Sequence, residues 1–214
     1  MNKSLNELSV AQAARISSVL TDVDGVHTKR EGGVSICELI SEDGIKTFTE
    51  VDGTLVRAFI PCDLNGVPEN GTVRVLAGRL GDKVFELYRF NIPAGQAVKD
   101  LVAHDLPVRF LSGRDSPSVR ARARALGAEP LLGVSEKYKC LKNQGRFDPS
   151  SILVVSDNMV DADLLHAVRE AGGISVAPAD AEPEALEAAE YVTKAKGGEG
   201  VIAEITRALF LARS

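Results

Sequence analysis

Two aspartates separated by a single residue, Asp22 and Asp24, have the spacing that most directly suggests chemistry in this chain. They end an apolar run in the string SSVLTDVDGVHT. Because side chains alternate along a strand, both carboxylates should point the same way at its carboxyl end, the edge where open α/β sheets bind ligands. Two carboxylates so close repel and need a cation or a proton between them. The pair is compatible with a magnesium site in which one aspartate attacks a phosphorus atom and the other moves a proton.

The composition is that of an ordinary soluble globular protein. The 214 residues, 44% hydrophobic and 26% charged, fit one domain or one domain with a sizeable insertion. A net charge of −5 without a Lys/Arg run predicts neither a nucleic-acid partner nor an anionic membrane. A small anion complexed with magnesium remains compatible with a local positive pocket.

Cysteine usage and the amino terminus bear on the compartment. Cys37, Cys62 and Cys140 are odd in number and have no C-x-x-C spacing, so neither a disulfide framework nor a zinc site is indicated. The first 18 residues are polar and amphipathic and lack the apolar stretch of a signal peptide or membrane span. We therefore expect a cytoplasmic protein with a short leading helix that begins near Ser9.

From Leu101 onward, strand and helix patterns alternate, which predicts an α/β fold with a parallel sheet covered on both faces. The apolar run 151–156 (SILVVS) is expected to be the central strand of this half. A helix over 94–104 is expected to precede this strand–helix half of the chain. The other strands are expected at 107–112, 129–132 and 173–177, and the other helices at 116–126, 136–144, 159–170 and 199–212.

Residues 29–88 follow a different pattern. Short alternating segments such as VSICELI and KTFTEV are separated by EDG, VDG, NG, ENG and GD. Gly, Asn and Asp tolerate the positive φ that tight hairpin turns require. We therefore predict a β-rich insertion, a flap or small cap, directly after the aspartate pair, with 1–28 and 89–214 forming the α/β core.

Four separated motifs resemble the haloacid dehalogenase superfamily of phosphotransferases. They are the D-x-D-G-V string at Asp22, the strand ending in Ser112-Gly113-Arg114, Lys137 in GVSEKYK, and the string SDNMVD at 156–161. Each is weak evidence alone, but their order, each after an appropriate element, makes the combination strong. The resemblance implies a Rossmann-like fold, a Mg²⁺ cofactor and phosphatase activity.

Within that superfamily the chain is most similar to the phosphatases of 3-deoxy-octulosonate 8-phosphate and related nine-carbon sugar acids. The similarity includes the carboxyl-terminal stretch that ends in a Gly-Gly-x-Gly loop at Gly197, Gly198 and Gly200, and the string RFNIPAGQAVKDL. It covers residues 17–28 and 88–212 and fails over most of 29–87. Members of this group assemble, usually as tetramers, so a homo-oligomer, tetramer or dimer, is expected.

The resemblance assigns roles to the aspartates. Asp22 is expected to be the nucleophile that forms an aspartyl-phosphate, and Asp24 the acid that protonates the leaving alkoxide and then activates water. Magnesium would be held by Asp22, by the main-chain carbonyl of Asp24 and by Asp157. Asn158 and Asp161 are expected just behind the metal, with Asp161 placed to orient Lys137 or a water in the magnesium shell.

The remaining site residues are expected to bind the phosphate. The hydroxyl of Ser112 and the amide of Gly113 could hold a phosphate oxygen ahead of the next helix, although Ser112 could also cap that helix. Lys137 would supply positive charge to the transferred phosphoryl group, and its GVSEK context favours it over Lys139 and Lys142. Arg114 could contact substrate or merely pair with a carboxylate.

Several other residues favour structural interpretations. His27 replaces a usually apolar residue, and a packed or exposed position is favoured over one lining the entrance. His104 and His166 show no metal spacing and are expected at the surface. Arg120, Arg122 and Arg124 are expected to form a solvated helix flank.

Three departures from the family pattern matter for function. Ser156 and Asn158 replace the usual Gly and Asp of the fourth motif, but both are small and polar and Asp157 remains, so activity should survive. The NIPAG string lacks the acidic residue of the family's F-N-V-x-D-G segment, so the family's sugar-acid contacts do not carry over. The larger insertion could shield the site or build an oligomer interface.

The sequence thus favours magnesium-dependent hydrolysis of a phosphomonoester of a sugar, sugar acid or nucleotide-like metabolite. One alternative is a phosphomutase, which would return the phosphoryl group to another hydroxyl; Asp24 and ready access of water favour hydrolysis instead. A second is a catalytically silent binding or scaffold subunit. The intact Asp22, Asp24, Lys137 and Asp157 argue against it.

Overall fold

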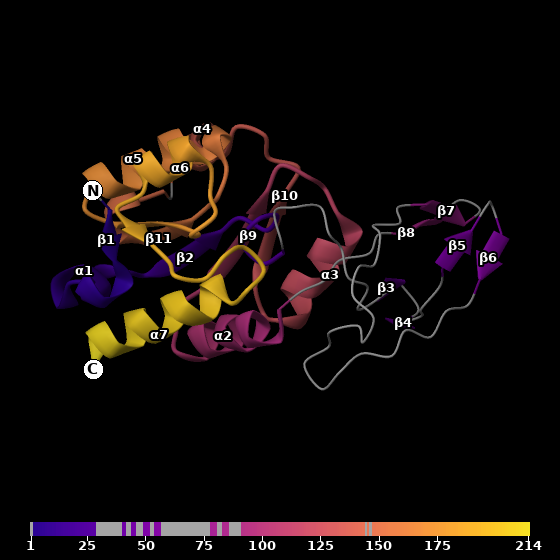
Figure 1. The fold of residues 1–214 in the computed structure, drawn as a ribbon, viewed down its shortest axis with the longest axis horizontal. Coiled ribbons are helices and arrows are strands. Elements are labelled where there is room, and N and C mark those ends of the chain that lie inside the picture. The colour runs from indigo at the N-terminus through magenta and orange to yellow at the C-terminus, as the bar shows by residue number, and fades with distance from the viewer. Residues whose placement is uncertain are drawn as a thin grey trace.

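The computed structural model describes residues 2–28, 91–143, 145 and 147–214, apart from the side chains of Pro117 and Ser118. Between 29 and 90 it describes only the backbone of six short strands. Figure 1 shows a central sheet between two layers of helices. The predicted α/β fold is confirmed.

The sheet has seven strands in the order β1-β13-β12-β11-β2-β9-β10, all paired in parallel. Their bounds are β1 Lys3–Ser4, β2 Ser18–Thr21, β9 Val108–Ser112, β10 Glu129–Leu132, β11 Ile152–Val155, β12 Ile174–Ala177 and β13 Tyr191–Val192. All four residues of β11 are buried, as expected for a central strand. β2 lies between β9 and β11, so strand order reverses at β2, and such a switch point is where open sheets form their ligand crevice.

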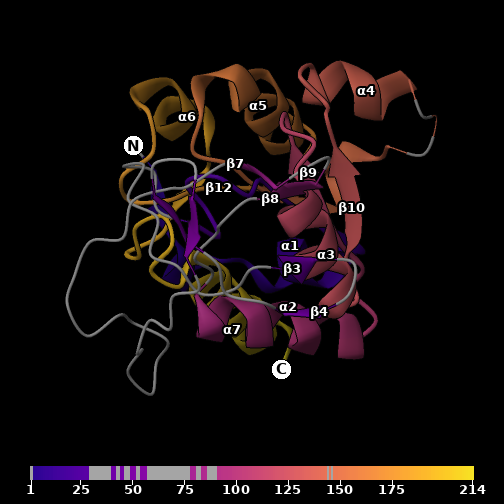
Figure 2. The same cartoon turned by 90° about the vertical axis from the view of Figure 1, so that its right-hand side faces the viewer.

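Seven α-helices are described: α1 Val10–Arg15, α2 Ile92–Ala103, α3 Pro117–Ala125, α4 Lys137–Asn143, α5 Ala162–Glu170, α6 Pro183–Ala188 and α7 Val201–Arg213. Three 3₁₀ turns accompany them, η1 Leu5–Glu7, η2 Pro149–Ser151 and η3 Met159–Asp161. In Figure 1, α4, α5 and α6 lie on one face of the sheet and α1, α2 and α7 on the other. The view in Figure 2, turned by 90°, shows the same two layers.

Alternation along the strands divides the core between these two faces. On β2, Val19 packs into the cluster under α2 and α7, whereas Leu20 packs into the cluster under α5. On β11, Leu153 and Val154 divide in the same way. A sheet buried on both faces explains why these strands are nearly continuous apolar runs.

The helix starts follow capping chemistry. The side chains of Ser9, Asn91 and Ser116 each accept a hydrogen bond from a backbone N–H in the first turn of α1, α2 and α3. The leading helix near Ser9 is therefore confirmed. The cap of α3 is Ser116 and not Ser112, so the capping alternative for Ser112 is wrong.

Some elements differ from the sequence-based expectation. The helix expected at 159–170 is divided into η3 and α5, because Asn158 caps a 3₁₀ turn before the α-helix begins. β1, β13 and α6 were not expected. The two strands have only two residues each, too short for a period to be recognised.

The described residues of the segment 29–88 form three antiparallel strand pairs. They are β3 Ile40–Ser41 with β4 Gly44–Ile45, β5 Thr49–Val51 with β6 Thr54–Val56, and β7 Gly78–Leu80 with β8 Lys83–Phe85. Each pair flanks one of the EDG, VDG or GD strings. The NG and ENG strings, Cys37 and Cys62 lie outside the described residues, and Cys140 forms no disulfide with a described residue. None of the described helices combines the length and apolar character that crossing a bilayer requires.

His27 is packed inside the fold. Its ring lies 4.4 Å from that of Phe110, centroid to centroid, and its Nε2 lies 3.1 Å from the Thr21 hydroxyl. Burial, with a smaller contribution from the positive charge of Arg122, lowers the His27 pKa to about 3. Arg122 itself is half-buried, and a Cβ on Gly95 would lie 2.4 Å from its Nη2. The expectation of a solvated arginine flank is therefore wrong for Arg122, which packs against α2.

The lowered His27 pKa predicts acid sensitivity. The unfolded chain binds a proton near pH 6.5 and the folded chain does not, so stability is lost as pH falls below 6.5, by about 2 kcal/mol at pH 5. His27→Gln should reduce this pH dependence in urea unfolding between pH 7.5 and 5. His166→Gln, at an exposed position on α5, is the control and should leave it unchanged. Identical slopes for wild type and His27→Gln would contradict the prediction.

Candidate active site

The predicted site residues come together at the carboxyl ends of three neighbouring strands. Asp22 follows β2, Ser112 ends β9, and Asp157 follows β11 after Ser156. The backbone N–H of Asp22 donates to the carbonyl of Val155 at 2.9 Å, which ties the end of β2 to that of β11. The site therefore lies at the switch point of the sheet.

The D-V-D-G string forms a tight turn against Asp157. The Asp22 Oδ1 accepts a hydrogen bond from the Val23 N–H at 2.7 Å. Gly25 has φ +75°, and a Cβ there would lie 2.0 Å from the Asp157 Oδ2. Glycine is favoured for two reasons. It adopts a positive φ without strain, and it has no side chain that would clash with the Asp157 carboxylate.

The Gly-Gly-x-Gly loop covers this turn. A Cβ on Gly197 would lie 2.2 Å from the carbonyl oxygen of Gly25, and the Gly198 N–H donates to the carbonyl of Val26 at 3.0 Å. The amide of Gly197 donates to the Asp180 Oδ1 at 2.8 Å. The loop before α7 thus holds the turn in place from outside.

Lys137, the first residue of α4, lies between two carboxylates. Its Nζ lies 2.9 Å from the Asp22 Oδ2 and 2.6 Å from the Asp161 Oδ2, and its side chain is 5% exposed. Lys139 and Lys142 are exposed, and Lys139 pairs with Glu136 at 2.9 Å. Among the three lysines, the geometry therefore favours Lys137 for a role at this site.

Burial and charge shift the pKa values of this cluster. Burial raises the pKa of Asp22 to about 6, although the attraction of Lys137 opposes it; the negative charge of Asp161 raises it further. Burial alone would lower the pKa of Lys137, but attraction to Asp22 and Asp161 outweighs it and the net shift is upward. One ammonium is shared by two carboxylates, so further positive charge here would favour the ionised form of Asp22.

The loop after β9 shapes the opposite side of the site. Ser112 is buried, and its hydroxyl accepts a hydrogen bond from the Arg114 N–H at 3.1 Å. The Arg114 Nε lies 3.9 Å from the Asp24 Oδ2, and both side chains are substantially exposed. Asp24 and Arg114 therefore lie at the mouth of the site, whereas Asp22 and Lys137 lie inside it.

Asn158 turns the chain between two of the aspartates. Its side chain accepts a hydrogen bond from the Val160 N–H at 3.1 Å, and its carbonyl accepts one from the Asp161 N–H at 3.1 Å. This 3₁₀ turn brings Asp161, which is 1% exposed, back toward Lys137. The predicted contact of Asp161 with Lys137 is present.

Ser156 is a site residue that sequence reasoning treated only as a tolerated substitution. Its hydroxyl donates to the Asp161 Oδ2 at 2.5 Å and lies 3.3 Å from the Asp22 Oδ2. The signal in the sequence was the polar residue itself, in place of a glycine at the end of the most apolar strand.

The residues present fit a magnesium ion. Asp22 and Asp157 offer carboxylates from adjacent strands, and Gly25 lets the turn carrying the Asp24 carbonyl approach Asp157. The Asp161 Oδ1 is buried and has no hydrogen-bond partner among the described residues, so this oxygen can still accept a hydrogen bond. Within the described ranges no three His, Cys, Asp or Glu side chains form a group that could hold a metal ion, so a main-chain carbonyl would have to complete a set of two carboxylates.

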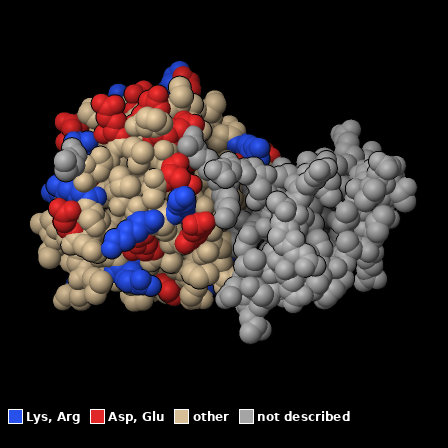
Figure 3. All heavy atoms as spheres, in the orientation of Figure 1, with Lys and Arg blue, Asp and Glu red and all other residues tan. Residues whose placement is uncertain are grey.

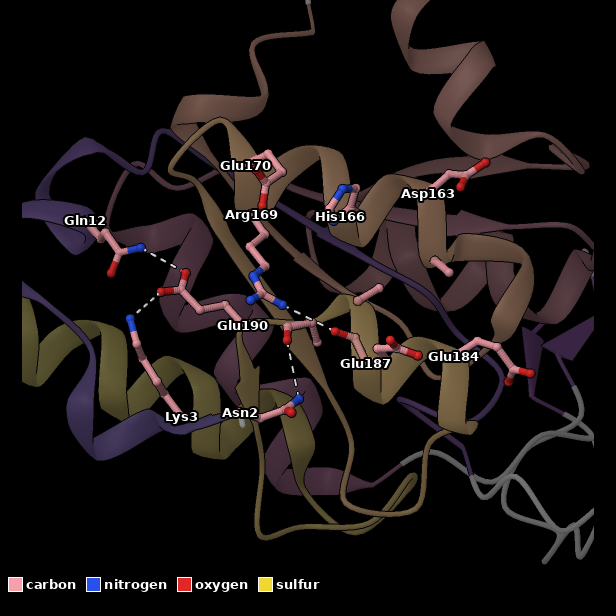
Figure 4. A pocket seen from close by; sticks show the side chains of 13 residues that line it. Asn2, Lys3, Gln12, Asp163, His166, Arg169, Glu170, Glu184, Glu187 and Glu190 are labelled. Carbon is pink, nitrogen blue, oxygen red and sulfur yellow. Dashed lines mark hydrogen bonds and ion pairs between the residues drawn. The ribbon is translucent and has the colours of Figure 1, made fainter.

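A separate cleft of about 880 Å³, lined by none of the proposed site residues, lies between the amino terminus, α1, α5, α6 and residues 189–190. Glu190 accepts from Lys3 at 2.7 Å and from Gln12 at 3.0 Å, and Arg169 donates to the carbonyl of Glu187. Figure 4 shows these three contacts as dashed lines. In Figure 3, acidic side chains gather over the part of the molecule where Figure 1 places α5 and α6. These contacts attach the first residues of the chain to the edge of the sheet, so we assign them a structural role.

Comparison with known proteins identifies the family. The chain is 32% identical over 156 residues to the 3-deoxy-D-manno-octulosonate 8-phosphate phosphatase KdsC of Yersinia pestis, a match that covers 71% of this chain and 79% of the relative. The chain belongs to the 3-deoxy-D-manno-octulosonate 8-phosphate (KDO 8-phosphate) phosphatases of the haloacid dehalogenase superfamily. It is thus a phosphatase of that superfamily, and the predicted resemblance is confirmed. No protein-family model matches the chain.

Solved structures of KDO 8-phosphate phosphatases share this fold. The crystal structure of the Y. pestis phosphatase aligns with a TM-score of 0.62 at 26% identity, covering 95% of this chain and 85% of that one. The phosphatase of Moraxella catarrhalis, solved with a magnesium ion, a phosphate ion and KDO, aligns with a TM-score of 0.64 at 17% identity, covering 95% and 91%. At 17% identity, the similarity to the M. catarrhalis structure supports the fold and nothing further.

Proposed function

We propose that this phosphatase hydrolyses the phosphomonoester of a small sugar or sugar acid, with magnesium, through an aspartyl-phosphate on Asp22. The observation that carries the proposal is the buried contact of Asp22 with Lys137 at the carboxyl edge of the sheet, in a chain of a phosphatase family. A buried carboxylate beside a fixed ammonium is suited to attack on phosphorus, because the charge that develops on the phosphoryl oxygens is met there.

The chemistry requires two steps. A carboxylate oxygen of Asp22 bonds to phosphorus while the ester P–O bond breaks, and Asp24 gives its proton to the departing alkoxide. Asp24 then takes a proton from water, whose oxygen bonds to phosphorus as the Asp22–phosphorus bond breaks and inorganic phosphate leaves. The exposed position of Asp24 at the mouth of the site suits this exchange of protons with leaving group and water.

Asp22, Asp157 and the Asp24 carbonyl would hold the magnesium ion, the ion found in the M. catarrhalis phosphatase. When bound, it supplies positive charge to the phosphoryl oxygens and lowers the proton affinity of Asp22. Asn158 and Asp161 support this set from behind. Ser112, Gly113, Lys137 and Arg114 are proposed to bind the phosphate and the leaving group.

The segment 29–88 is proposed to form a β-rich flap that completes the site or builds a homo-oligomer, a tetramer or a dimer, around a core of 1–28 and 89–214. Its three antiparallel strand pairs support a β-rich unit. Shielding would exclude water from the phosphoryl group and select the leaving group. We propose that the protein is cytoplasmic. Its partner would be a small phosphorylated metabolite, and neither nucleic acid nor a membrane.

The test measures phosphate release from KDO 8-phosphate, other phosphorylated sugars and sugar acids, and nucleotides, each with magnesium or with EDTA. Magnesium-dependent turnover, strongest with a sugar acid phosphate, is expected. Release that EDTA leaves unchanged would overturn the role of magnesium. Transfer of phosphate between sugar hydroxyls without net release would favour a mutase, and binding without either reaction a silent subunit.

A further inference from the structure

Ser156 occupies a position where the family pattern has glycine, yet its side chain lies inside the carboxylate–lysine cluster. It is 1% exposed and follows β11, and its backbone N–H donates to the carbonyl of Val176 at 3.2 Å. The backbone is thereby fixed by the sheet, and the hydroxyl is directed at the two carboxylates bound to Lys137.

The hydroxyl has one proton, and the distances decide where it goes. The contact with the Asp161 Oδ2 is the closer one and has the geometry of a hydrogen bond to a carboxylate, whereas the 3.3 Å contact with the Asp22 Oδ2 is long. Ser156 therefore donates to Asp161 and packs against Asp22. The same oxygen of Asp161 also accepts from Lys137 at 2.6 Å.

Two donors on one oxygen fix the orientation of the Asp161 carboxylate. Its other oxygen, Oδ1, has no hydrogen-bond partner among the described residues, so within them the two contacts at Oδ2 alone orient the group. The terminal torsion of aspartate is broad, and with Lys137 as the single donor the carboxylate could rotate about that contact. Lys137 would move with it, and Lys137 holds the Oδ2 of Asp22 at 2.9 Å, while the Val23 N–H holds the Oδ1.

We propose that Ser156 is a positioning residue of this phosphatase, whose hydroxyl locks Asp161 and, through Lys137, the attacking carboxylate of Asp22. The inference rests on the proposed function, because Asp22 is taken as the nucleophile. It assigns a positioning role to a hydroxyl at a position where the family pattern has no side chain.

The test compares Ser156→Ala and Ser156→Gly with wild type. Ser156→Ala removes the donor and leaves no space for a replacement, so kcat should fall about tenfold while KM changes less than twofold, since misorientation affects the reacting group more than binding. Ser156→Gly leaves space for a water molecule that can donate to Asp161, and it should lose less than Ser156→Ala.

The control is Ser175→Ala on the neighbouring strand β12. Ser175 is equally buried, pairs in register with Val154, and its hydroxyl accepts from the Glu190 N–H at 2.9 Å and not from a site residue. This variant should lose stability in urea unfolding and keep the wild-type kcat. A wild-type kcat in Ser156→Ala, or an equal fall in kcat for Ser175→Ala, would overturn the proposal.

Failure of the proposed function has a different signature, namely a wild type that releases no phosphate from any compound. The geometric claim is then decided by crystal structures of wild type and Ser156→Ala. In the variant alone, the Asp161 carboxylate is expected to be rotated or to have two alternative conformations. Superimposable carboxylates and Lys137 ammonium groups in the two structures would refute it.

Discussion

Asp22→Asn is expected to lower the rate of phosphate release by at least about 10⁴-fold, since an amide has no anionic oxygen to attack phosphorus. The amide can still accept the 2.7 Å hydrogen bond from the Val23 N–H, so the turn should persist. Single-turnover assays with saturating magnesium and enzyme in excess over substrate measure the loss. A variant within a factor of ten of wild type would exclude Asp22 as the nucleophile.

The same variant should be at least as stable as wild type at pH 8 in EDTA. The Asp22 pKa rises from 3.8 to about 6 on folding, mainly through burial, so ionisation penalises the folded state. The penalty is absent below pH 3.8, grows up to about pH 6 and then stays constant, with an upper bound of about 3 kcal/mol. The stability gain of Asp22→Asn should therefore shrink toward pH 4. A gain that is the same at pH 4 and pH 8 would show that ionisation of Asp22 is not its cause.

Lys137→Met should have the second-largest effect, on both activity and stability. It leaves the buried carboxylates of Asp22 and Asp161 facing each other without the ammonium, which should lower the free energy of unfolding by about 3–5 kcal/mol. Loss of positive charge at the phosphoryl group should lower kcat by about 10²- to 10³-fold. Urea unfolding and steady-state kinetics measure the two effects separately.

Lys139→Met, two residues along α4, is the matched control. Lys139 is exposed and pairs only at the surface with Glu136, so its loss should cost less than about 0.5 kcal/mol and leave kcat unchanged. In the double variant Asp22→Asn with Lys137→Met, part of the lost stability should return, because one buried charge is gone. Equal losses of kcat and of unfolding free energy in Lys137→Met and Lys139→Met would contradict a special role for the buried Lys137.

The sequence was sufficient for the elements that position the site. Polar residues directly after long apolar runs predicted which strand ends carry Asp22, Ser112 and Asp157, because buried parallel strands give a strong signal. The choice of Lys137 over Lys139 and Lys142 came from its GVSEK context and not from periodicity. Its burial could not be predicted, since a lysine on a short helix is usually solvated.

The unpredicted features depend on contacts between segments far apart in the chain. β1 pairs with β13 across more than 180 residues, and two-residue strands carry no periodic pattern. Arg122 was misjudged because its half-buried position depends on the absence of a side chain at Gly95 on another helix. The hydroxyl contact of Ser156 likewise exists only once η3 has turned Asp161 back toward Lys137.

The pairing of β2 with β11 has a consequence for folding. These neighbours in the sheet, in register from Ser18 with Ile152 to Thr21 with Val155, are separated by more than 130 residues of chain. Parallel contacts of such long sequence separation form slowly, because the intervening chain must be ordered or looped out first. Asp22 and Asp157 follow these two strands, so they meet only once β2 and β11 have paired. Recovery of magnesium-dependent turnover during refolding should therefore lag behind recovery of helical circular dichroism and report the pairing of β2 with β11.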